Sequence, residues 1–206
     1  MLLATVKGDP GNNNTGFLSM FPVINGTVSS VETRSSPAGT AVLFGTALLP
    51  AEDQIFVTDA SFGSATLSLP PSLSNPDSDS SNKSLVAVSA STEIVDQKAT
   101  CWATFSQLTG TAFVTDVAVN HLVEIDTVTG KLVTEFQSQN GNGGMIDLEG
   151  DKEGSFVFAL SPGNGTEGHG TRVVVFDVSG GRGSVSEVEN FEVGVGGGSA
   201  QGMAVY

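Results

Sequence analysis

The sequence predicts an all-β protein of the β-propeller class, with about three to four four-stranded blades. Segments 41–59, 99–116 and 143–160 each start with small or apolar residues, pass through a polar turn and end in a strand-like string, FVTD in the first two. The first two also place a large aromatic residue, Phe44 or Trp102, before the turn. The second copy lies 57 residues after the first, and the third follows 43 residues later, which aligns Phe56, Phe113 and Phe156. Repeats of about 40 to 50 residues with four short strands are typical of propeller blades. Alternating stretches such as TAFVTDV favour strands, and glycine-dense stretches such as SGGRG favour hairpin turns.

The segments around these copies continue the pattern. Further strands are expected at 64–69, 85–88, 121–126, 131–136, 172–178 and 185–193. The opening residues 2–8 and 16–23 resemble the back half of a unit, and residues 202–206 resemble the front edge of another. Residues 70–84 are rich in Pro, Ser and Asp. We therefore expect a single domain over 1–206, with 70–84 as an exposed loop inserted within a blade.

Charge and composition exclude several function classes. The chain of 206 residues has 22 acidic and 8 basic side chains, a formal net charge of −14. This charge repels phosphate backbones and anionic lipid headgroups, so neither nucleic acid nor a membrane surface is an expected partner. No apolar run reaches the length of a membrane-spanning helix, and the first residues lack the pattern of a secretory signal. One cysteine cannot form an internal disulfide.

Four segments resemble a known protein family. They are LLATVKG with GFLSMFPVINGTVSSV at the start, LPAEDQIFVTDASFG at 49–63, ATCWATFSQLTGTAFVTDVAVNHLVEID at 99–126, and QGMAVY at the end. Together they resemble the C-terminal half of the fungal 3-carboxymuconate cyclase-like proteins, which are secreted seven-bladed propellers. The resemblance covers nearly all of the chain, and the pattern from Cys101 to Asp116 is its most specific part. Because a full propeller of this family has about twice as many residues, the resemblance implies a partial propeller, a fragment of the ring.

The family resemblance implies an extracellular or cell-wall glycoprotein, non-catalytic or weakly catalytic, whose blade loops bind a small carboxylate or lactone, or a cell-wall partner. An alternative is an enzyme, either a lactonizing isomerase of the 3-carboxymuconate cyclase type or a lactonase, acting at the mouth of the propeller channel. A second alternative is a structural module that associates with itself through open blade edges.

Four residues are weak candidates for catalysis. Asp59 and Asp116 recur directly after the FVT strand of two units. They either contribute to a ring of acids that binds a cation or acts as a base, or cap the corner after each strand as Asx turns. His169 lies in a glycine-rich loop, and Arg172 close to it is suited to hold a carboxylate in a bidentate fork. The alternatives are a loop histidine and a surface ion pair.

No cofactor or metal site is expected. The string at 163–168 matches GxGxxG, but a strand rather than a helix follows it, which favours a hairpin loop. His121 and His169 are the only histidines, and no spacing typical of zinc ligands occurs. Cys101 has no basic neighbour in the sequence, which favours a buried structural thiol.

Four sequons predict sites of N-glycosylation. All four fall in expected loops, as glycan acceptors require; their asparagines are Asn13, Asn25, Asn82 and Asn164.

Overall fold

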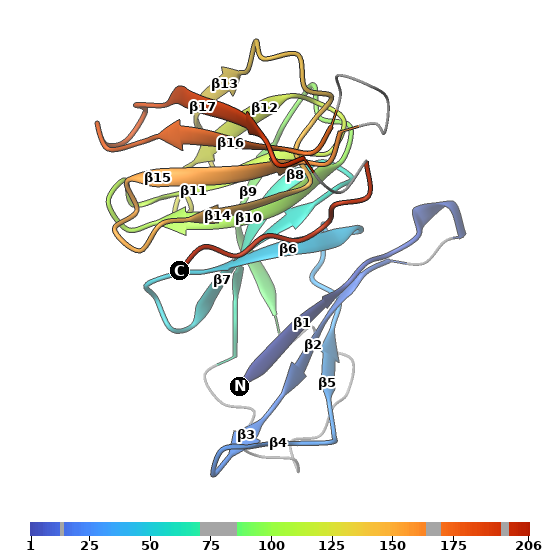
Figure 1. Cartoon of the computed structure of the whole chain (residues 1–206). Helices are drawn as coiled ribbons and strands as arrows, with labels where there is room; N and C mark the ends of the chain where they lie inside the picture. Colours follow the sequence, from blue (N-terminus) through green and yellow to red (C-terminus); the bar gives the residue numbers. More distant parts are fainter. Residues whose placement is uncertain (13–14, 71–85, 164–169, 195–197) are drawn as a thin grey trace.

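The computed structural model describes the chain except residues 13–14, 71–85, 164–169 and 195–197, and it is built almost entirely from β-strands (Figure 1). Sheet 1 contains β1 (Leu2–Val6), β2 (Phe17–Phe21) and β5 (Thr33–Ser35), and a two-stranded ribbon of β3 (Val23–Ile24) and β4 (Thr27–Val28) extends from it. Sheet 2 contains β6 (Leu43–Leu48), β7 (Gln54–Asp59), β8 (Gly63–Ser68) and β9 (Ala87–Glu93). Sheet 3 contains β10 (Thr100–Ser106), β11 (Thr111–Asp116), β12 (His121–Ile125) and β13 (Leu132–Gln137), and sheet 4 contains β14 (Asp147–Gly150), β15 (Phe156–Ser161), β16 (Arg172–Asp177) and β17 (Ser186–Glu192). A short 3-10 turn at Pro10–Asn12 is the one helical element of the described residues. The predicted all-β fold with repeated four-stranded sheets is confirmed.

The four sheets stack on one another in chain order through their first strands. β1 contacts β6, β6 contacts β10, and β10 contacts β14. Each of these strands is the inner edge of its sheet, and the neighbouring strands follow outward in sequence order. This arrangement explains the internal repeats, because each sheet meets the same kind of neighbour.

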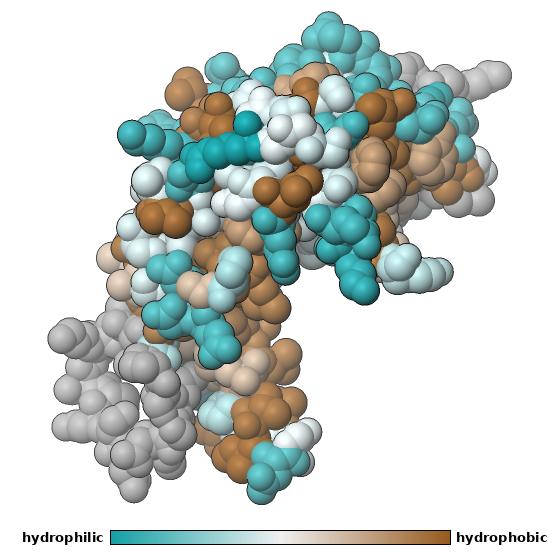
Figure 2. Space-filling model, turned by 90° about the vertical axis from the view of Figure 1, so that its left-hand side faces the viewer, coloured by the Kyte–Doolittle hydropathy of each residue, from teal (hydrophilic) through white to brown (hydrophobic). Residues whose placement is uncertain are grey.

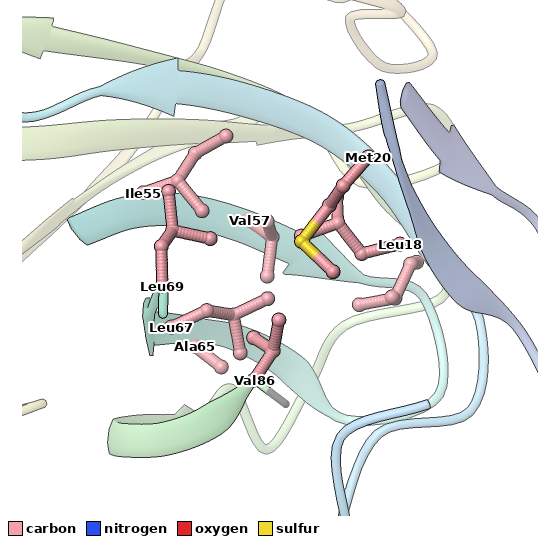
Figure 3. Packing of buried hydrophobic residues seen from close by; sticks show 9 residues of the cluster. Leu18, Met20, Ile55, Val57, Ala65, Leu67, Leu69 and Val86 are labelled. Carbon is pink, nitrogen blue, oxygen red and sulfur yellow. The ribbon is translucent and has the colours of Figure 1, made fainter. Parts of the chain in front are cut away.

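The alternation of side chains along the strands places apolar groups on both faces of the middle sheets. As a result, three hydrophobic clusters form, one between each pair of successive sheets. In the first cluster, Leu18 and Met20 of sheet 1 pack on Ile55 and Val57 of β7 and on Leu67 of β8 (Figure 3). The core is thus divided into three layers between sheets.

A phenylalanine recurs at the third position of the second strand in sheets 2, 3 and 4. Phe56 is buried in the cluster between sheets 2 and 3, and Phe113 is buried in the cluster between sheets 3 and 4. The sequence comparison aligned Phe156 with these residues, but Phe158 holds the matching position in β15. The alignment was displaced by two residues because both Phe156 and Phe158 lie on the same face of the strand.

The ends of the chain differ from the expectation in one respect. Residues 2–8 were expected to resemble the back half of a unit, yet β1 is the inner strand of sheet 1 and contacts β6. Residues 202–206 form no strand, but the Met203 amide donates to the Asp147 carboxylate of β14 at 2.8 Å, so this segment lies beside the inner strand of sheet 4. The predicted loop at 70–84 lies outside the described residues except for Pro70.

The antiparallel order brings three connections of sheets 3 and 4 to one end of the stack. These connections join β11 to β12, β13 to β14, and β15 to β16. The tight turns from β10 to β11 and from β12 to β13 lie at the opposite end. We call the first end the loop end, and it carries the candidate site.

Candidate ligand groove at the loop end

A groove of about 630 Å³ lies at the loop end between sheets 3 and 4. Its walls come from the connections after β11, β13 and β15. The described lining residues are Val117, Ala118, Asn140, Gly141, Asn142, Gly143, Gly144, Ser161, Pro162, Gly163, Gly170 and Arg172. Because five of them are glycines, the backbone itself forms much of the surface.

Glycine determines where the groove is narrow and where it is open. A Cβ atom at Gly144 would lie 2.3 Å from the Val117 carbonyl oxygen, so this position admits only glycine without a backbone shift. A Cβ atom at Gly143 would meet no atom of the described residues within 4 Å. The two neighbours therefore have opposite roles: Gly144 allows two loops to approach, and Gly143 faces open space.

Arg172 is the one charged side chain of the described groove lining. It is the first residue of β16, and its guanidinium contacts the Glu192 carboxylate of β17 at 3.0 Å. The ion pair restrains the long side chain, while part of the guanidinium remains accessible. A planar guanidinium with five N–H donors suits a carboxylate or the oxygens of a lactone.

Asparagine and glutamate side chains hold the groove wall in place. Asn120 donates to the Asn140 amide oxygen at 2.8 Å, and Asn140 in turn donates to Glu187 of β17 at 3.0 Å. Asn142 donates to Asn190 at 3.3 Å. These bonds join the connection between β13 and β14 to the outer strand of sheet 4, so the groove wall is preorganised before any ligand arrives.

The predicted site residues fall in different places. Asp59 and Asp116 are fully buried at the ends of β7 and β11, and their carboxylates accept backbone N–H groups. Asp116 accepts from Lys98, Ala99, Ala118 and Val119 at 2.7 to 3.1 Å. Each aspartate thus fixes the chain that enters its own sheet, which agrees with the Asx-turn interpretation. Of the four candidates, only Arg172 lines the groove, and His169 lies outside the described residues.

A smaller pocket of about 230 Å³ lies along the inner strands of sheets 1 to 3, and the sequence did not reveal it. Thr5, Lys7, Leu43, Phe44 and Trp102 line it. The Phe44 and Trp102 rings meet edge to face at 5.8 Å, and the Lys7 ammonium lies 5.7 Å from the Phe44 ring centre. The repeat did place Phe44 and Trp102 at equivalent positions, but Lys7 joins them only through the stacking of sheet 1 on sheet 2.

Two buried acidic groups near the inner strands have raised pKa values. Burial, and secondly the nearby Asp147 carboxylate, raise the pKa of the Cys101 thiol to about 11, and its Sγ donates to the Ile146 carbonyl at 3.3 Å. Burial raises the pKa of Asp147, and this effect exceeds that of the hydrogen bond from the Met203 amide, which lowers it. Cys101 is therefore a structural thiol, as the sequence suggested.

Other site types have less support among the described residues. His121 is buried, and its Nδ1 lies 2.8 Å from Glu135. No group of three potential metal-ligating His, Cys, Asp or Glu side chains occurs in the part of the chain that the structure describes. Nor does any helix there have the length and hydrophobicity needed to cross a membrane.

Asn25 is exposed at the tip of the β3–β4 ribbon, and Asn13, Asn82 and Asn164 lie outside the described residues.

Comparison with known proteins identifies a fold but no family. No protein-family model and no curated protein matches the chain. Among solved structures, a putative 6-phosphogluconolactonase from Bacteroides uniformis is similar, with 18% identity over 84% of this chain and 51% of that one and a TM-score of 0.59. Hydrazine synthase from Kuenenia stuttgartiensis shares 19% identity over 85% of this chain and 45% of that one, with a TM-score of 0.55.

A nidogen/laminin complex shares 11% identity over 92% of this chain and 62% of the matched chain, with a TM-score of 0.53. The chain thus spans about half the length of the first solved structures it matches. The lactonase and the nidogen complex are propeller-like. With its stacked four-stranded sheets and these neighbours, the chain has a β-propeller-type fold.

Proposed function

We propose that the chain is the ligand-binding part of a secreted, carboxymuconate cyclase-like propeller, and that the loop-end groove binds a small carboxylate or its lactone. The observation that carries the proposal is Arg172, held by Glu192 at the edge of a preorganised groove. The overall charge of −14 would otherwise repel an anion, so a carboxylate ligand needs such a local cation. Glycine backbone around it allows a ligand to approach closely.

Binding is favoured over catalysis by the chemistry of the groove. None of the described lining residues carries a carboxylate, imidazole or thiol, so none of them is a general base for lactone formation or hydrolysis. Asp59 and Asp116, the acids suggested by the repeat, are fully buried and bonded to backbone amides. A lactonizing isomerase or lactonase is the second candidate, and it is supported by the similarity to the structure described as a putative 6-phosphogluconolactonase.

Secretion and a cell-wall location belong to the same proposal. The exposed position of Asn25 in the sequon Asn25-Gly26-Thr27, at the tip of a two-stranded ribbon, supports glycan attachment there. Treating the protein from its native source with an N-glycosidase should lower its mass. An unchanged mass would contradict the glycoprotein proposal while leaving the groove untested, so binding is measured separately.

The binding test uses 3-carboxymuconate and its lactone with isothermal titration calorimetry. Gly143→Phe should fill the groove, because no atom in the described part of the chain lies within 4 Å of the position of its Cβ atom. Arg172→Gln should remove the cation. Each variant should lose at least tenfold in affinity, about 1.4 kcal/mol. Val128→Phe is the matched control, since Val128 is 81% exposed in the β12–β13 turn at the opposite end of sheet 3.

Two results would overturn the binding proposal: no heat of binding to the native protein, or equal affinities for the native protein and Gly143→Phe. The same solutions, followed by ultraviolet absorbance, test the enzyme. Loss of the muconate absorbance that scales with protein concentration would favour the lactonizing enzyme over a binding protein.

A further inference from the structure

Sheets 1 and 4 each have one face that no other sheet covers. In sheets 2 and 3 both faces are buried, and the three hydrophobic clusters account for them. Sheet 4 buries Val157 and Val174 against sheet 3, so the opposite side chains of β15 and β16 face outward. Sheet 1 buries Leu18 and Met20 against sheet 2, so its other face is also uncovered.

Three positions in the middle of the uncovered face of sheet 4 are more apolar than the equivalent positions of the covered faces, while Glu149 and Glu189 lie on the same face at the strands to either side. Strand pairing aligns positions across the three complete sheets. Where sheet 2 has Thr58, Ser64 and Thr66, sheet 3 has Thr115, Leu122 and Glu124, and sheet 4 has Leu160, Val173 and Val175. The last three lie beside Phe158. Leu160 is buried, Val173 and Val175 are partly exposed, and the exposed fraction rises to 36% at Phe156 and 45% at Phe191. An apolar surface on a sheet of a stacked series marks a place where another sheet packs.

The uncovered face of sheet 1 is also partly apolar, and the Arg34 guanidinium lies over the Phe17 ring on the same face. Leu2, Ala4 and Val6 of β1 point away from sheet 2 and pair with Phe21, Ser19 and Phe17 of β2. Leu2 and Val6 are 48% and 38% exposed. Figure 2 shows hydrophobic residues gathered at the lower end of the molecule, where Figure 1 places sheet 1 and its ribbon.

The segment after β17 shows how a sheet would be covered. In the interface between sheets 3 and 4, the residues before β14 lie on sheet 3: the Met145 amide donates to the Asp116 carbonyl, and Cys101 donates to the Ile146 carbonyl. In the same way, Met203 lies on sheet 4 through its bond to Asp147. The strings GGM at 143–145 and QGM at 201–203 are similar. The segment after β17 thus meets sheet 4 in the same way as the segment before β14 meets sheet 3, and a further sheet would stack on sheet 4 as sheet 4 stacks on sheet 3.

We propose that two copies of this chain associate head to tail, with the free face of sheet 4 in each copy packing on the free face of sheet 1 in the other. Two such contacts close one ring. The chain covers 51% of the propeller-like structure described as a putative 6-phosphogluconolactonase, so two copies supply about the amount of chain of one such ring. The contact is heterologous, so it forms a closed pair only if the rotation between the two copies brings both contacts together, and otherwise extends into a filament. This inference is independent of the ligand proposed for the groove.

Light scattering during gel filtration tests the association, and the native chain should have twice its own mass of 21.0 kDa. A sheet 4 variant carries Phe156→Lys and Phe191→Lys, and a sheet 1 variant carries Leu2→Lys and Val6→Lys. Each should be monomeric. Lysine lowers the net negative charge of the chain, so general charge repulsion cannot cause the loss. Val95→Lys with Val128→Lys, at positions 86% and 81% exposed, is the matched control and should remain dimeric.

Mixing the two monomeric variants distinguishes head-to-tail contact from other forms of association. One copy then has an intact sheet 1 face and the other an intact sheet 4 face, so a mixture of equal parts should recover a species of twice the monomer mass. A native chain that stays monomeric at 100 µM would overturn the proposal. So would open-ended growth of the native chain, or a sheet 1 variant that still dimerises alone, because the contact would then be an isologous one through sheet 4.

Discussion

The hydroxyl of Thr58 in sheet 2 donates to the carbonyl of Cys101 in sheet 3 at 2.6 Å. The same hydroxyl accepts the Gly45 amide at 2.7 Å. Gly45 belongs to the inner strand β6 of sheet 2, Cys101 to the inner strand β10 of sheet 3, and Thr58 to β7 beside β6. The Thr58 side chain therefore links the two inner strands. Stacking is therefore secured by polar bonds as well as by the apolar clusters.

Replacing Thr58 with valine should destabilise the fold. The change keeps the shape of the side chain but leaves the buried Gly45 amide without its acceptor and the Cys101 carbonyl without its donor, which costs about 1 to 3 kcal/mol. The free energy of unfolding in urea measures the effect. Thr115 occupies the equivalent place in sheet 3, is buried, and its hydroxyl has no hydrogen-bond partner among the residues that the structure describes. Thr115→Val should therefore be neutral or stabilising, and an equal loss in both variants would contradict the assigned role of Thr58.

Asp116→Asn should destabilise the chain more than an average surface change. The amide cannot accept all four backbone N–H groups that the carboxylate accepts, and bonds to a charged acceptor contribute about 1.5 to 3 kcal/mol. Chemical denaturation should show a loss of about 2 to 3 kcal/mol. Asp53→Asn is the control, since Asp53 is exposed in the β6–β7 turn, and it should change stability little. An unchanged Asp116→Asn variant would mean that this corner is not held by the carboxylate.

Asp126 should make the free energy of unfolding depend on pH below about pH 4. Its hydrogen bond with Arg182, from the β16–β17 turn of sheet 4, is the main cause that lowers the pKa of this carboxyl to about 2, from 3.8. Because the folded pKa lies below the unfolded one, the stabilisation is present above about pH 4 and is lost as the pH falls towards 2. Arg182 is half exposed, so the contribution is about 1 kcal/mol or less. Asp126→Asn should be less stable than the native chain at pH 6 and equal to it at pH 2; a difference that persists at pH 2 would assign the effect to the turn and not to the charge.

Cys101 should resist thiol reagents in the folded protein. Its pKa of about 11 leaves almost no thiolate at pH 8, and the side chain is buried. Reaction with a chromogenic disulfide should proceed only as fast as the protein unfolds. It should be complete in about 6 M guanidinium chloride, which denatures the protein. Rapid labelling of the native chain would place Cys101 at the surface and contradict the packing of sheet 3 on sheet 4.

The sequence predicted features that lie within one repeat. The FVTD strings located β7 and β11, and the position of Asp59 and Asp116 after them suggested the corner bonds that the structure contains. Glycine and polar clusters located most turns, because turn residues act locally. Phe44 and Trp102 were also recognised as equivalent.

Features that depend on stacking between sheets were not predictable. Lys7 reaches Phe44 only because sheet 1 packs on sheet 2, and Arg172 lines a groove whose other walls come from sheet 3. The place of β1 as an inner strand was missed for the same reason, since a strand's position in a sheet depends on its partners and not on its own composition.

Gly45→Ala tests most directly the central claim, that successive sheets stack through their inner strands. A Cβ atom at Gly45 would lie 2.6 Å from the Cys101 carbonyl oxygen and 2.7 Å from the Trp102 Cα atom, both backbone atoms of β10. The free energy of unfolding should fall by about 3 kcal/mol or more, because two backbones must separate. Gly143→Ala, where the new methyl group meets no atom within 4 Å in the ranges that the structure describes, should leave stability nearly unchanged. If Gly45→Ala were as stable as Gly143→Ala, β6 and β10 would not be neighbours, and the stacked arrangement would be wrong.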